Sequence, residues 1–407
     1  MLVYRTQIVG VAAVFLVLLF FYSVSQYSSF SPTFSSRAPS TIPSSATGLL
    51  KDVYNQTLGF QKILAISLPS RTDHRDAFIL STAVTGIKGS FVDGVAGKDV
   101  LDKVLPPGDL KAFSSLGNRG SWRAHLNALQ QVVDQDLTTA LIMEDDVDWD
   151  IRVKSQLYEF AGAVNLLTQP LAHGNSEYAD PTFPTPRKDL SGHMDIFPGP
   201  KLSTIPPKSS PYGDDWDVLW LGHCGARFPS MERDPTLPQG RALINDLTAP
   251  SQQHVYLGFG SDEILRTYPN HTRAVSHTAE VVCTLAYAVS QRAARQILYD
   301  VGLKALESPF DIMLRKYCDG LGERQVRKCY TAQPSYMAHH RAAGKASKGS
   351  DINDWEDKEK ADEESATAYT FNVRLSTKMN LQKLVDGDTD YVDQWPDDKE
   401  GMNEITW

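Results

Sequence analysis

A short apolar run that ends in three acidic residues is the feature that most constrains the fold of this chain. Residues 140–143 are Ala-Leu-Ile-Met, and Glu144, Asp145 and Asp146 follow them directly. Such a run is typical of a buried strand, and ligands of α/β sheets bind beyond the ends of such strands. In an extended chain, Glu144 and Asp146 project to one side and Asp145 to the other. Two carboxylates on one side predict a divalent metal site, because hard cations prefer oxygen ligands.

Strand and helix patterns alternate along the middle of the chain. Short apolar runs bounded by Gly, Pro or polar residues predict buried strands, and apolar residues three and four positions apart predict helices. The expected strands cover residues 62–68, 90–92, 140–143, 218–221, 283–290 and 326–334, and the expected helices cover residues 76–85, 120–133, 151–167, 291–301 and a segment from 308 onward. This alternation predicts an α/β domain with a mainly parallel sheet.

A second acidic cluster, Asp214, Asp215 and Asp217, precedes the strand expected after it. It is a rival metal site, but acidic residues before a strand are more often solvated turn residues, so we place it second. Asp148 and Asp150, which follow the first cluster, are also expected in a solvated turn.

Residues 8–22 are unbroken apolar sequence, with Arg5 before them and no further Lys or Arg until Arg37. This pattern predicts a secretory-pathway address, and the charge on the N-terminal side predicts a cytoplasmic N-terminus. We expect residues 1–24 to form a cytoplasmic tip and an uncleaved signal-anchor helix that spans the membrane. A signal peptide cleaved near residues 23–25 is the alternative.

Composition divides the rest of the chain. Residues 25–60 begin rich in Ser and Pro and are expected to form a stem, residues 61–352 form the main domain, and residues 353–407 form an acidic tail. From residue 351 onward there are 16 Asp and Glu against 6 Lys and Arg, so the net charge of -9 comes from the tail. We expect no nucleic-acid partner, because the main domain has no basic excess to release counterions.

The cysteines have no metal-type spacing, and in an oxidising compartment they can form two disulfides. They are Cys224, Cys283, Cys318 and Cys329. Of the three possible connectivities, we expect the one that joins Cys318 to Cys329. Buried free thiols are the alternative.

Several short motifs follow one another from residue 66 to residue 352. They are ISLP at 66–69 with Arg71 and Arg75, GSWRAHL at 120–126, LIMEDDV at 141–147, DVLWLG at 217–222, AYAVS at 286–290 with Ala293, PFD at 309–311 and SDI at 350–352. In this order they resemble the signatures of glycosyltransferase family 25, the group of lipooligosaccharide and procollagen galactosyltransferases. The insertion at residues 168–215 and the opening at residues 118–120 depart from the bacterial pattern at positions that bear on the acceptor site.

The resemblance implies a GT-A fold, with a Rossmann-type, mainly parallel sheet flanked by helices that binds a nucleotide sugar. It also implies a divalent metal, usually Mn²⁺ and otherwise Mg²⁺. The implied reaction is an inverting transfer of a sugar, often galactose from UDP-galactose.

Transfer from a nucleotide sugar requires a cation that stabilises the charge of the leaving diphosphate. Asp146 is the expected metal ligand, and Glu144, on the same side, is expected to hold the metal through water or to contact the ribose. Asp145 is expected to contact the ribose or to orient a neighbouring residue. His339 is expected to complete the metal shell in preference to His340, and surface positions for both histidines are the alternative.

An inverting transfer also requires a carboxylate that takes the proton of the acceptor hydroxyl. Asp311 is the candidate from its match to the family's Pro-x-Asp motif, but a helix capping box with Ser308 would also explain it. Arg71 and Arg75 are expected to bind the diphosphate or the uridine, or else to be surface charges at a helix start. His125 is a further cofactor-binding candidate, with a hydrogen-bonded structural histidine as the alternative.

The leading hypothesis is a single-pass type II membrane glycosyltransferase of the Golgi or endoplasmic reticulum, with a lumenal catalytic domain. Its partners would be a UDP-sugar donor, a glycan or glycoprotein acceptor, and the membrane through the N-terminal helix. A second hypothesis is a catalytically inactive lumenal binding or scaffold protein with the same fold. A third is a metal-dependent hydrolase built on the second acidic cluster.

Overall fold

The computed structural model describes residues 48–113, 115–173, 177–184, 194–199, 202–345, 349–352 and 362–397. These residues belong to one compact unit, residues 38–407. The predicted signal-anchor helix and the first part of the predicted stem, residues 1–47 together, lie outside the described residues. Within the described ranges, no helix has both the length and the hydropathy that crossing a membrane requires.

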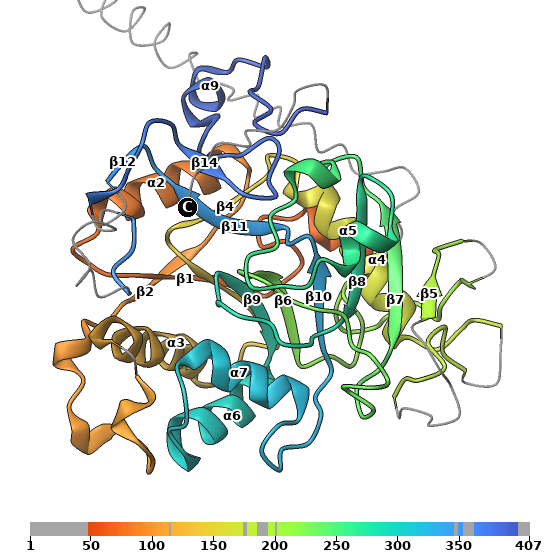
Figure 1. Ribbon diagram of the computed structural model, residues 1–407, viewed down its shortest axis with the longest axis horizontal. Helices are drawn as coiled ribbons and strands as arrows, with labels where there is room; N and C mark the ends of the chain where they lie inside the picture. The colour runs from red at the N-terminus through yellow and green to blue at the C-terminus, as the bar shows by residue number, and fades with distance from the viewer. Residues whose placement is uncertain are drawn as a thin grey trace, which may run out of the picture. The chain divides into compact units, whose positions relative to one another are not determined.

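A 12-stranded sheet forms the centre of this unit (Figure 1). Its main path runs in the order β2 (Ser90–Asp93), β1 (Lys62–Ser67), β3 (Thr139–Glu144), β9 (Ala286–Ser290), β6 (Val218–Gly222), β10 (Cys329–Gln333), β8 (Thr272–His277), β7 (Gly240–Asn245) and β5 (Met194–Ile196). On this path β9 and β8 run antiparallel to their neighbours, and the other strands share one direction. The predicted α/β class with a mostly parallel sheet is confirmed.

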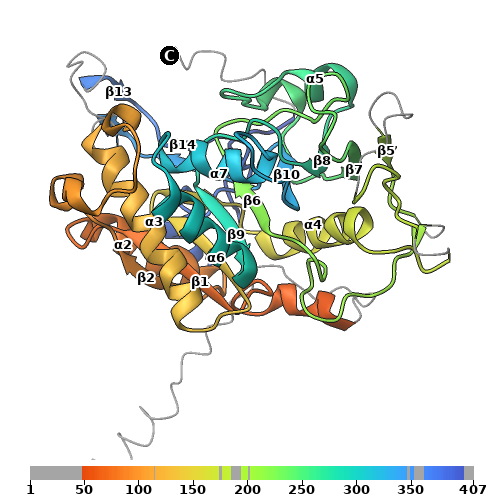
Figure 2. The same cartoon turned by 90° about the horizontal axis from the view of Figure 1, so that it is seen from below.

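Helices cover both faces of the sheet (Figures 1 and 2). One face carries α2 (Thr72–Val84) and α4 (Val153–Thr168), and the other carries α3 (Leu116–Asp134), α6 (Gln291–Tyr299) and α7 (Phe310–Asp319). Successive strand residues point to opposite faces, so Leu141 of β3 lies in the same core as Leu157 of α4, whereas Ile142 shares a core with Leu126 of α3. Strands covered on both faces have continuous apolar runs, as residues 140–143 of β3 do.

Side-chain caps set where two of these helices begin. Ser290 Oγ accepts a hydrogen bond of 3.2 Å from the Ala293 N–H, so α6 starts where the sequence predicts. The helix predicted from residue 120 begins earlier, because Ser115 Oγ accepts a hydrogen bond of 3.0 Å from the Asn118 N–H.

The chain connections place the carboxyl ends of β1 and β3 at a topological switch point. β1 leads through α2 to β2 on one side, and β2 leads through α3 to β3 on the other side, with α2 and α3 on opposite faces. Glu144 ends β3 in register with Ile66 of β1. Ligands of open α/β sheets bind beyond the strand ends at such a point, so the acidic cluster stands where a ligand site is expected.

Three further strands extend the sheet beyond this edge, namely β4 (Val147–Trp149), β11 (Met337–Arg341) and β14 (Tyr369–Thr370). β4 and β14 pair antiparallel with β11, and β11 continues parallel to β6 at Gly222. Beyond them, β12 (Gly344–Lys345) pairs with β13 (Glu364–Ser365), and α9 (Leu381–Asp386) follows in the tail. The described part of the acidic tail therefore packs against the domain.

The expectation that Asp148 and Asp150 are solvated turn residues is wrong, because both side chains are fully buried. Asp148 Oδ2 accepts hydrogen bonds from the hydroxyls of Thr370, at 2.7 Å, and Ser376. Asp150 forms a two-point ion pair with Arg152 at 2.7 and 2.8 Å. Asp148 thus joins β4 to the tail, and the Leu375 N–H links the tail to Asp150 by donating a hydrogen bond of 3.0 Å to Asp150 Oδ2.

Two disulfides form within the described residues, Cys224–Cys283 and Cys318–Cys329. The predicted pairing of Cys318 with Cys329 is confirmed. It joins the end of α7 to the start of β10, whereas the other disulfide joins the loops after β6 and before β9.

Replacing Asp148 with Ala is expected to lower the free energy of unfolding by roughly 3 kcal/mol, because two buried hydroxyls lose their acceptor. Urea unfolding of the full chain measures this difference. The matched control is Asp388→Ala, an exposed residue of the same tail, which should change stability by less than about 0.5 kcal/mol. Equal effects of the two substitutions would show that Asp148 does not hold the tail.

Candidate functional site

Segments that end or begin at one edge of the sheet line a pocket of about 460 Å³. They are Glu144 at the end of β3, residues 223–226 after β6, residues 283–285 before β9 and residues 333–335 after β10. β9 is antiparallel to β3 and β6, so its first residues lie at the same edge as the carboxyl ends of its neighbours. The pocket therefore occupies the ligand-binding edge of an α/β sheet.

Glu144, Asp146 and His339 come together beside this pocket. Each offers one ligand atom, and these atoms all lie within 4.8 Å of one another. The chain turns at residues 145–146, and β4 then pairs with β11, so the His340 N–H donates a hydrogen bond of 3.0 Å to the Asp146 carbonyl. This pairing brings His339 Nε2 within 3.6 Å of Asp146 Oδ2. Two carboxylates and one imidazole form a ligand set that suits Mn²⁺ or Mg²⁺.

The two histidines lie on β11 (Met337–Arg341). Because side chains alternate along a strand, His340 points away from His339 and lies 3.1 Å from Thr370 Oγ1. Burial lowers the pKa of His340 to about 4, although the Asp148 carboxylate acts in the opposite direction.

The electrostatics of the cluster fit a bound cation. Burial raises the pKa of Asp146, and the neighbouring carboxylates of Glu144 and Asp145 raise it further, although His339 lowers it. Asp146 Oδ1 is buried and has no hydrogen-bond partner among the described residues. A buried carboxylate oxygen without a donor is costly unless a cation or proton compensates it. These residues therefore fit a divalent ion.

Thr284 and His125 favour the ionised form of Glu144. Thr284 Oγ1 donates a hydrogen bond of 3.0 Å to Glu144 Oε1, and His125 Nε2 lies 3.3 Å from the same oxygen. Burial raises the pKa of Glu144, but the hydrogen bond and charge of His125, the charge of His339 and the Thr284 hydroxyl outweigh it and lower the pKa. His125 is buried, contacts Tyr287 Oη at 3.0 Å and does not line the pocket. The structure therefore places His125 as a positioning residue for Glu144 rather than in contact with a ligand.

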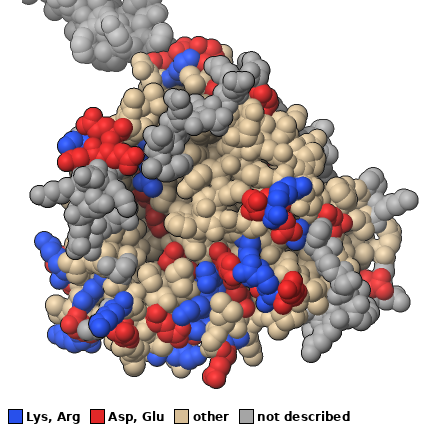
Figure 3. All heavy atoms as spheres, viewed as in Figure 1, with Lys and Arg blue, Asp and Glu red and all other residues tan. Residues whose placement is uncertain are grey.

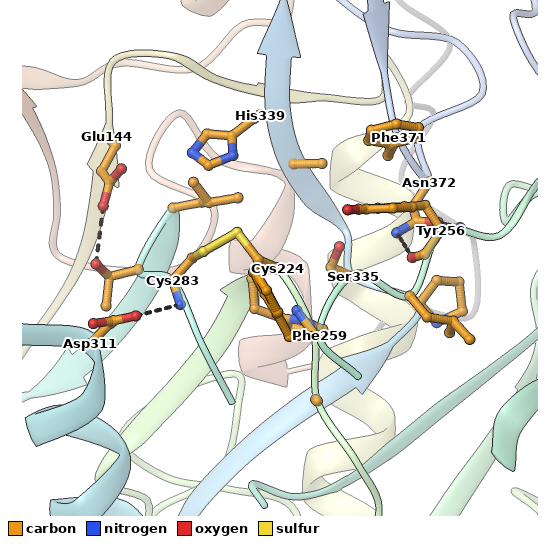
Figure 4. Close-up of a pocket in the computed structure, with 18 of the residues that line it drawn as sticks. Glu144, Cys224, Tyr256, Phe259, Cys283, Asp311, Ser335, His339, Phe371 and Asn372 are labelled. Carbon is orange, nitrogen blue, oxygen red and sulfur yellow. Dashed lines mark hydrogen bonds between the residues drawn. A yellow bond between two sulfur atoms is a disulfide. The ribbon is translucent and has the colours of Figure 1, made fainter. Parts of the chain in front are cut away.

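Asp311 lines the pocket across from Glu144, at the start of α7 (Figure 4). Its Oδ2 accepts a hydrogen bond of 2.9 Å from the Cys283 N–H. The predicted capping box with Ser308 does not form, because Ser308 Oγ donates to the Glu307 carbonyl instead. The side chain of Asp311 therefore faces the loop that carries the Cys224–Cys283 disulfide. Its hydrogen bond to the Cys283 N–H, and not a helix cap, fixes its position.

Arg71, Arg75 and Asp145 lie outside the pocket lining. Arg71 forms ion pairs with Asp73 and with Asp351, and Arg75 forms one with Asp93. Asp145 Oδ1 lies 2.9 Å from His74 Nδ1. These ion pairs occupy the arginines that the sequence suggests for the diphosphate.

Arg341 is a pocket residue that the sequence reasoning missed. Among the described lining residues it is the only Lys or Arg, and no side-chain hydrogen bond or ion pair of its guanidinium occurs within the described part of the chain. It stands two residues after His339 on β11, so both side chains are on the same face of the strand. Recognition of residues 337–341 as a strand would have revealed it.

The rival cluster of aspartates has other partners. Asp214 accepts hydrogen bonds from the backbone and hydroxyl of Ser209, at 2.8 and 2.7 Å. Asp215 and Asp217 both lie 2.9 Å from Arg292 NH2, and Lys328 also pairs with Asp215. These contacts explain the three carboxylates as structural, and none of them lines the pocket.

His223 also lines the pocket, and its ring is expected to stay neutral. Burial lowers its pKa to about 4, against a hydrogen bond of 2.9 Å to the Ala332 carbonyl. The pKa of His223 is therefore lower in the folded state than in the unfolded state. Its contribution to the free energy of unfolding is fully present above pH 6.5 and is lost as the pH falls toward about 4, by roughly 3 kcal/mol in all.

Nuclear magnetic resonance of histidine-labelled full chain tests this expectation, with His223→Gln to assign the ring signals. The His223 signals should keep their neutral shifts from pH 8 down to pH 5. A titration of this ring with a midpoint near pH 6.5 would contradict the expectation that burial keeps His223 neutral.

Comparison with known proteins adds a distant relationship. No protein-family model matches the chain. The chain is 29% identical over 115 residues to procollagen galactosyltransferase 2 of Homo sapiens and to that of Mus musculus, over 26% of this chain and 18% of each relative. It is also 29% identical over 111 residues to the probable inactive glycosyltransferase 25 family member 3 of Bos taurus, over 25% of this chain and 19% of that protein. The match spans less than a fifth of each relative's length, and it supports a glycosyltransferase 25-like relationship and a transferase-type function.

Proposed function

We propose that this pocket catalyses a metal-dependent, inverting transfer of a hexosyl group from a nucleoside diphosphate sugar to a hydroxyl of a glycan or glycoprotein. The proposed donor is UDP-galactose, in keeping with the names of the human and mouse relatives. The observation that carries the proposal is the convergence of Glu144, Asp146 and His339 beside one pocket that also contains Asp311.

Asp146, Glu144 and His339 would hold Mn²⁺ or Mg²⁺, with Glu144 bound directly or through water. When bound, the ion supplies positive charge that stabilises the leaving diphosphate. Thr284 and His125 keep the Glu144 carboxylate ionised and in place for this contact.

Asp311 would act as the general base. Its carboxylate takes the proton of the acceptor hydroxyl as the hydroxyl oxygen bonds to the anomeric carbon of the donor sugar. The bond between the anomeric carbon and the diphosphate oxygen breaks, and its electron pair leaves with UDP. The Cys283 N–H fixes the orientation of Asp311 through its hydrogen bond of 2.9 Å.

Arg341 would bind the diphosphate. A guanidinium matches two phosphate oxygens at once and stays charged at every working pH. Arg71 and Arg75 are ion-paired outside the pocket lining, whereas Arg341 lines it on the strand that carries His339. Arg341 therefore takes the role that the sequence suggests for the two earlier arginines.

We also propose that residues 8–22 anchor the protein in the Golgi or endoplasmic reticulum membrane, with the catalytic domain in the lumen. The apolar run after Arg5 supports this topology. Both disulfides support it as well, because disulfides persist in oxidising compartments.

Asp146→Asn is expected to lower Mn²⁺-dependent hydrolysis of UDP-galactose by roughly 100-fold or more, because the leaving diphosphate loses its stabilising charge. Release of UDP from purified full chain measures the rate, and circular dichroism checks that the fold is intact. A chelator should abolish turnover of the unsubstituted chain.

The matched control is Asp215→Asn, which alters the rival acidic cluster and should leave turnover unchanged. If instead Asp215→Asn removes activity and Asp146→Asn does not, the proposed site is wrong. Binding of UDP-galactose without any turnover in the unsubstituted chain would favour the inactive binding protein.

Arg341→Gln is expected to weaken the binding of UDP by about 10- to 100-fold and to leave the binding of uridine unchanged, because only UDP carries the charged groups that Arg341 contacts. Isothermal titration calorimetry with Mn²⁺ present measures both affinities. Arg266→Gln, which changes an exposed arginine on α5 (Glu263–Thr267), is the control. Equal losses of affinity for UDP and for uridine would show that Arg341 does not bind the diphosphate.

A further inference from the structure

Aromatic side chains line the part of the pocket that lies beyond the Cys224–Cys283 disulfide. Figure 4 shows Glu144 and Asp311 on one side of this disulfide and Tyr256, Phe371 and Asn372 on the other. Phe259 lines the pocket below them. We call Tyr256, Phe259 and Phe371 the aromatic platform. None of its members belongs to a motif of the glycosyltransferase resemblance.

Two segments far apart in sequence hold Tyr256 and Phe371 together. The Asn372 side chain accepts a hydrogen bond from the Tyr256 N–H and donates one to the Tyr256 carbonyl, both at 2.9 Å. The rings of Tyr256 and Phe371 stack with centroids 4.1 Å apart and an interplanar angle of 22°. Phe371 also stacks on the buried Trp395, at 6.2 Å and 11°. The positions of Tyr256 and Phe371 are therefore fixed before any ligand arrives.

Phe259 is presented to solvent by a tight turn. Its ring is 83% exposed, although its N–H donates a hydrogen bond of 2.9 Å to the Cys224 carbonyl. The turn requires glycine at Gly258, where φ is +53° and a Cβ would lie 1.9 Å from the Cys224 carbonyl oxygen. Phe259 therefore leaves apolar ring surface uncovered at the pocket, where a bound ligand can cover it.

Two neutral polar groups stand beside the platform. Figure 4 shows Ser335 and Asn372 next to the aromatic rings, and neither carries a charge. Figure 3 shows that the middle of this face of the molecule has few charged side chains, whereas Lys and Arg mix with Asp and Glu over the lower helices α3, α6 and α7. Aromatic faces with neutral hydrogen-bonding groups suit a sugar ring, whose C–H face stacks and whose hydroxyls pair with amides and hydroxyls.

We propose that the aromatic platform is the acceptor subsite and that it binds an uncharged sugar ring, so that the acceptor is a glycan. This inference rests on the proposed function, because Asp311 must reach a hydroxyl of the bound ring or of its neighbour. The aromatic rings themselves carry no positive charge for a diphosphate, whose proposed binding residue is Arg341 of β11.

Phe259→Ala tests the proposal without threatening the fold, because the removed ring is exposed. Methyl β-D-galactoside and methyl β-D-glucoside serve as probes, with saturation-transfer magnetic resonance for binding and UDP-galactose consumption for transfer. The substitution should raise the dissociation constant or the KM of the preferred glycoside about tenfold. Hydrolysis of UDP-galactose without acceptor and affinity for uridine should not change, and Phe259→Tyr should restore glycoside binding.

Phe197→Ala is the matched control, since Phe197 is 66% exposed and does not line the pocket. If the unsubstituted chain hydrolyses UDP-galactose but Phe259→Ala binds glycosides as before, the acceptor inference fails and the proposed function stands. The inference also fails if Phe259→Ala weakens the binding of uridine instead. It fails as well if the unsubstituted chain binds a polypeptide without sugars, for which unfolded, unglycosylated ribonuclease A is the probe, and binds neither glycoside. Absence of all donor binding and turnover in the unsubstituted chain would overturn the proposed function itself.

Discussion

Two neighbouring carboxylates that repel each other are the constraint on which this site depends. Glu144 ends a central strand, and Asp146 follows one turn residue later, with their oxygens in reach of a common ligand point. The fold holds them there through the pairing of β4 with β11 and through Thr284 and His125 behind Glu144. Lys378 from the tail adds a hydrogen bond of 3.1 Å to the Asp145 carbonyl. The stability of the surrounding structure thus maintains two carboxylates whose mutual repulsion is unfavourable, an arrangement that fits the proposed cation.

The sequence predicts best what depends on nearby residues. The apolar run before Glu144, the periodicity of α3 and the alternation of elements were enough to predict an α/β sheet with the acidic cluster at its edge. The Cys318–Cys329 disulfide joins cysteines that are close in sequence.

The errors arise where distant segments decide the outcome. Asp148 resembles a turn residue locally, but its hydroxyl partners are more than 200 positions away along the chain. Arg71 has the right chemistry for a phosphate, yet Asp351 neutralises it. Residues 337–341, MAHHR, lack the alternation of a half-buried strand, so the sequence does not reveal that Arg341 and His339 share a face. The acidic composition of the tail suggests a solvent-exposed segment, but Phe371 and Trp395 from this tail stack on each other beside the pocket.

The Cys224–Cys283 disulfide has a consequence for the geometry of the pocket. One of its cysteines presents Phe259 through a carbonyl, and the other orients Asp311 through an N–H. A single covalent bond therefore keeps the two loops in mutual alignment. Loss of this bond would release both loops together, so the orientation of Asp311 and the position of Phe259 depend on the same covalent link.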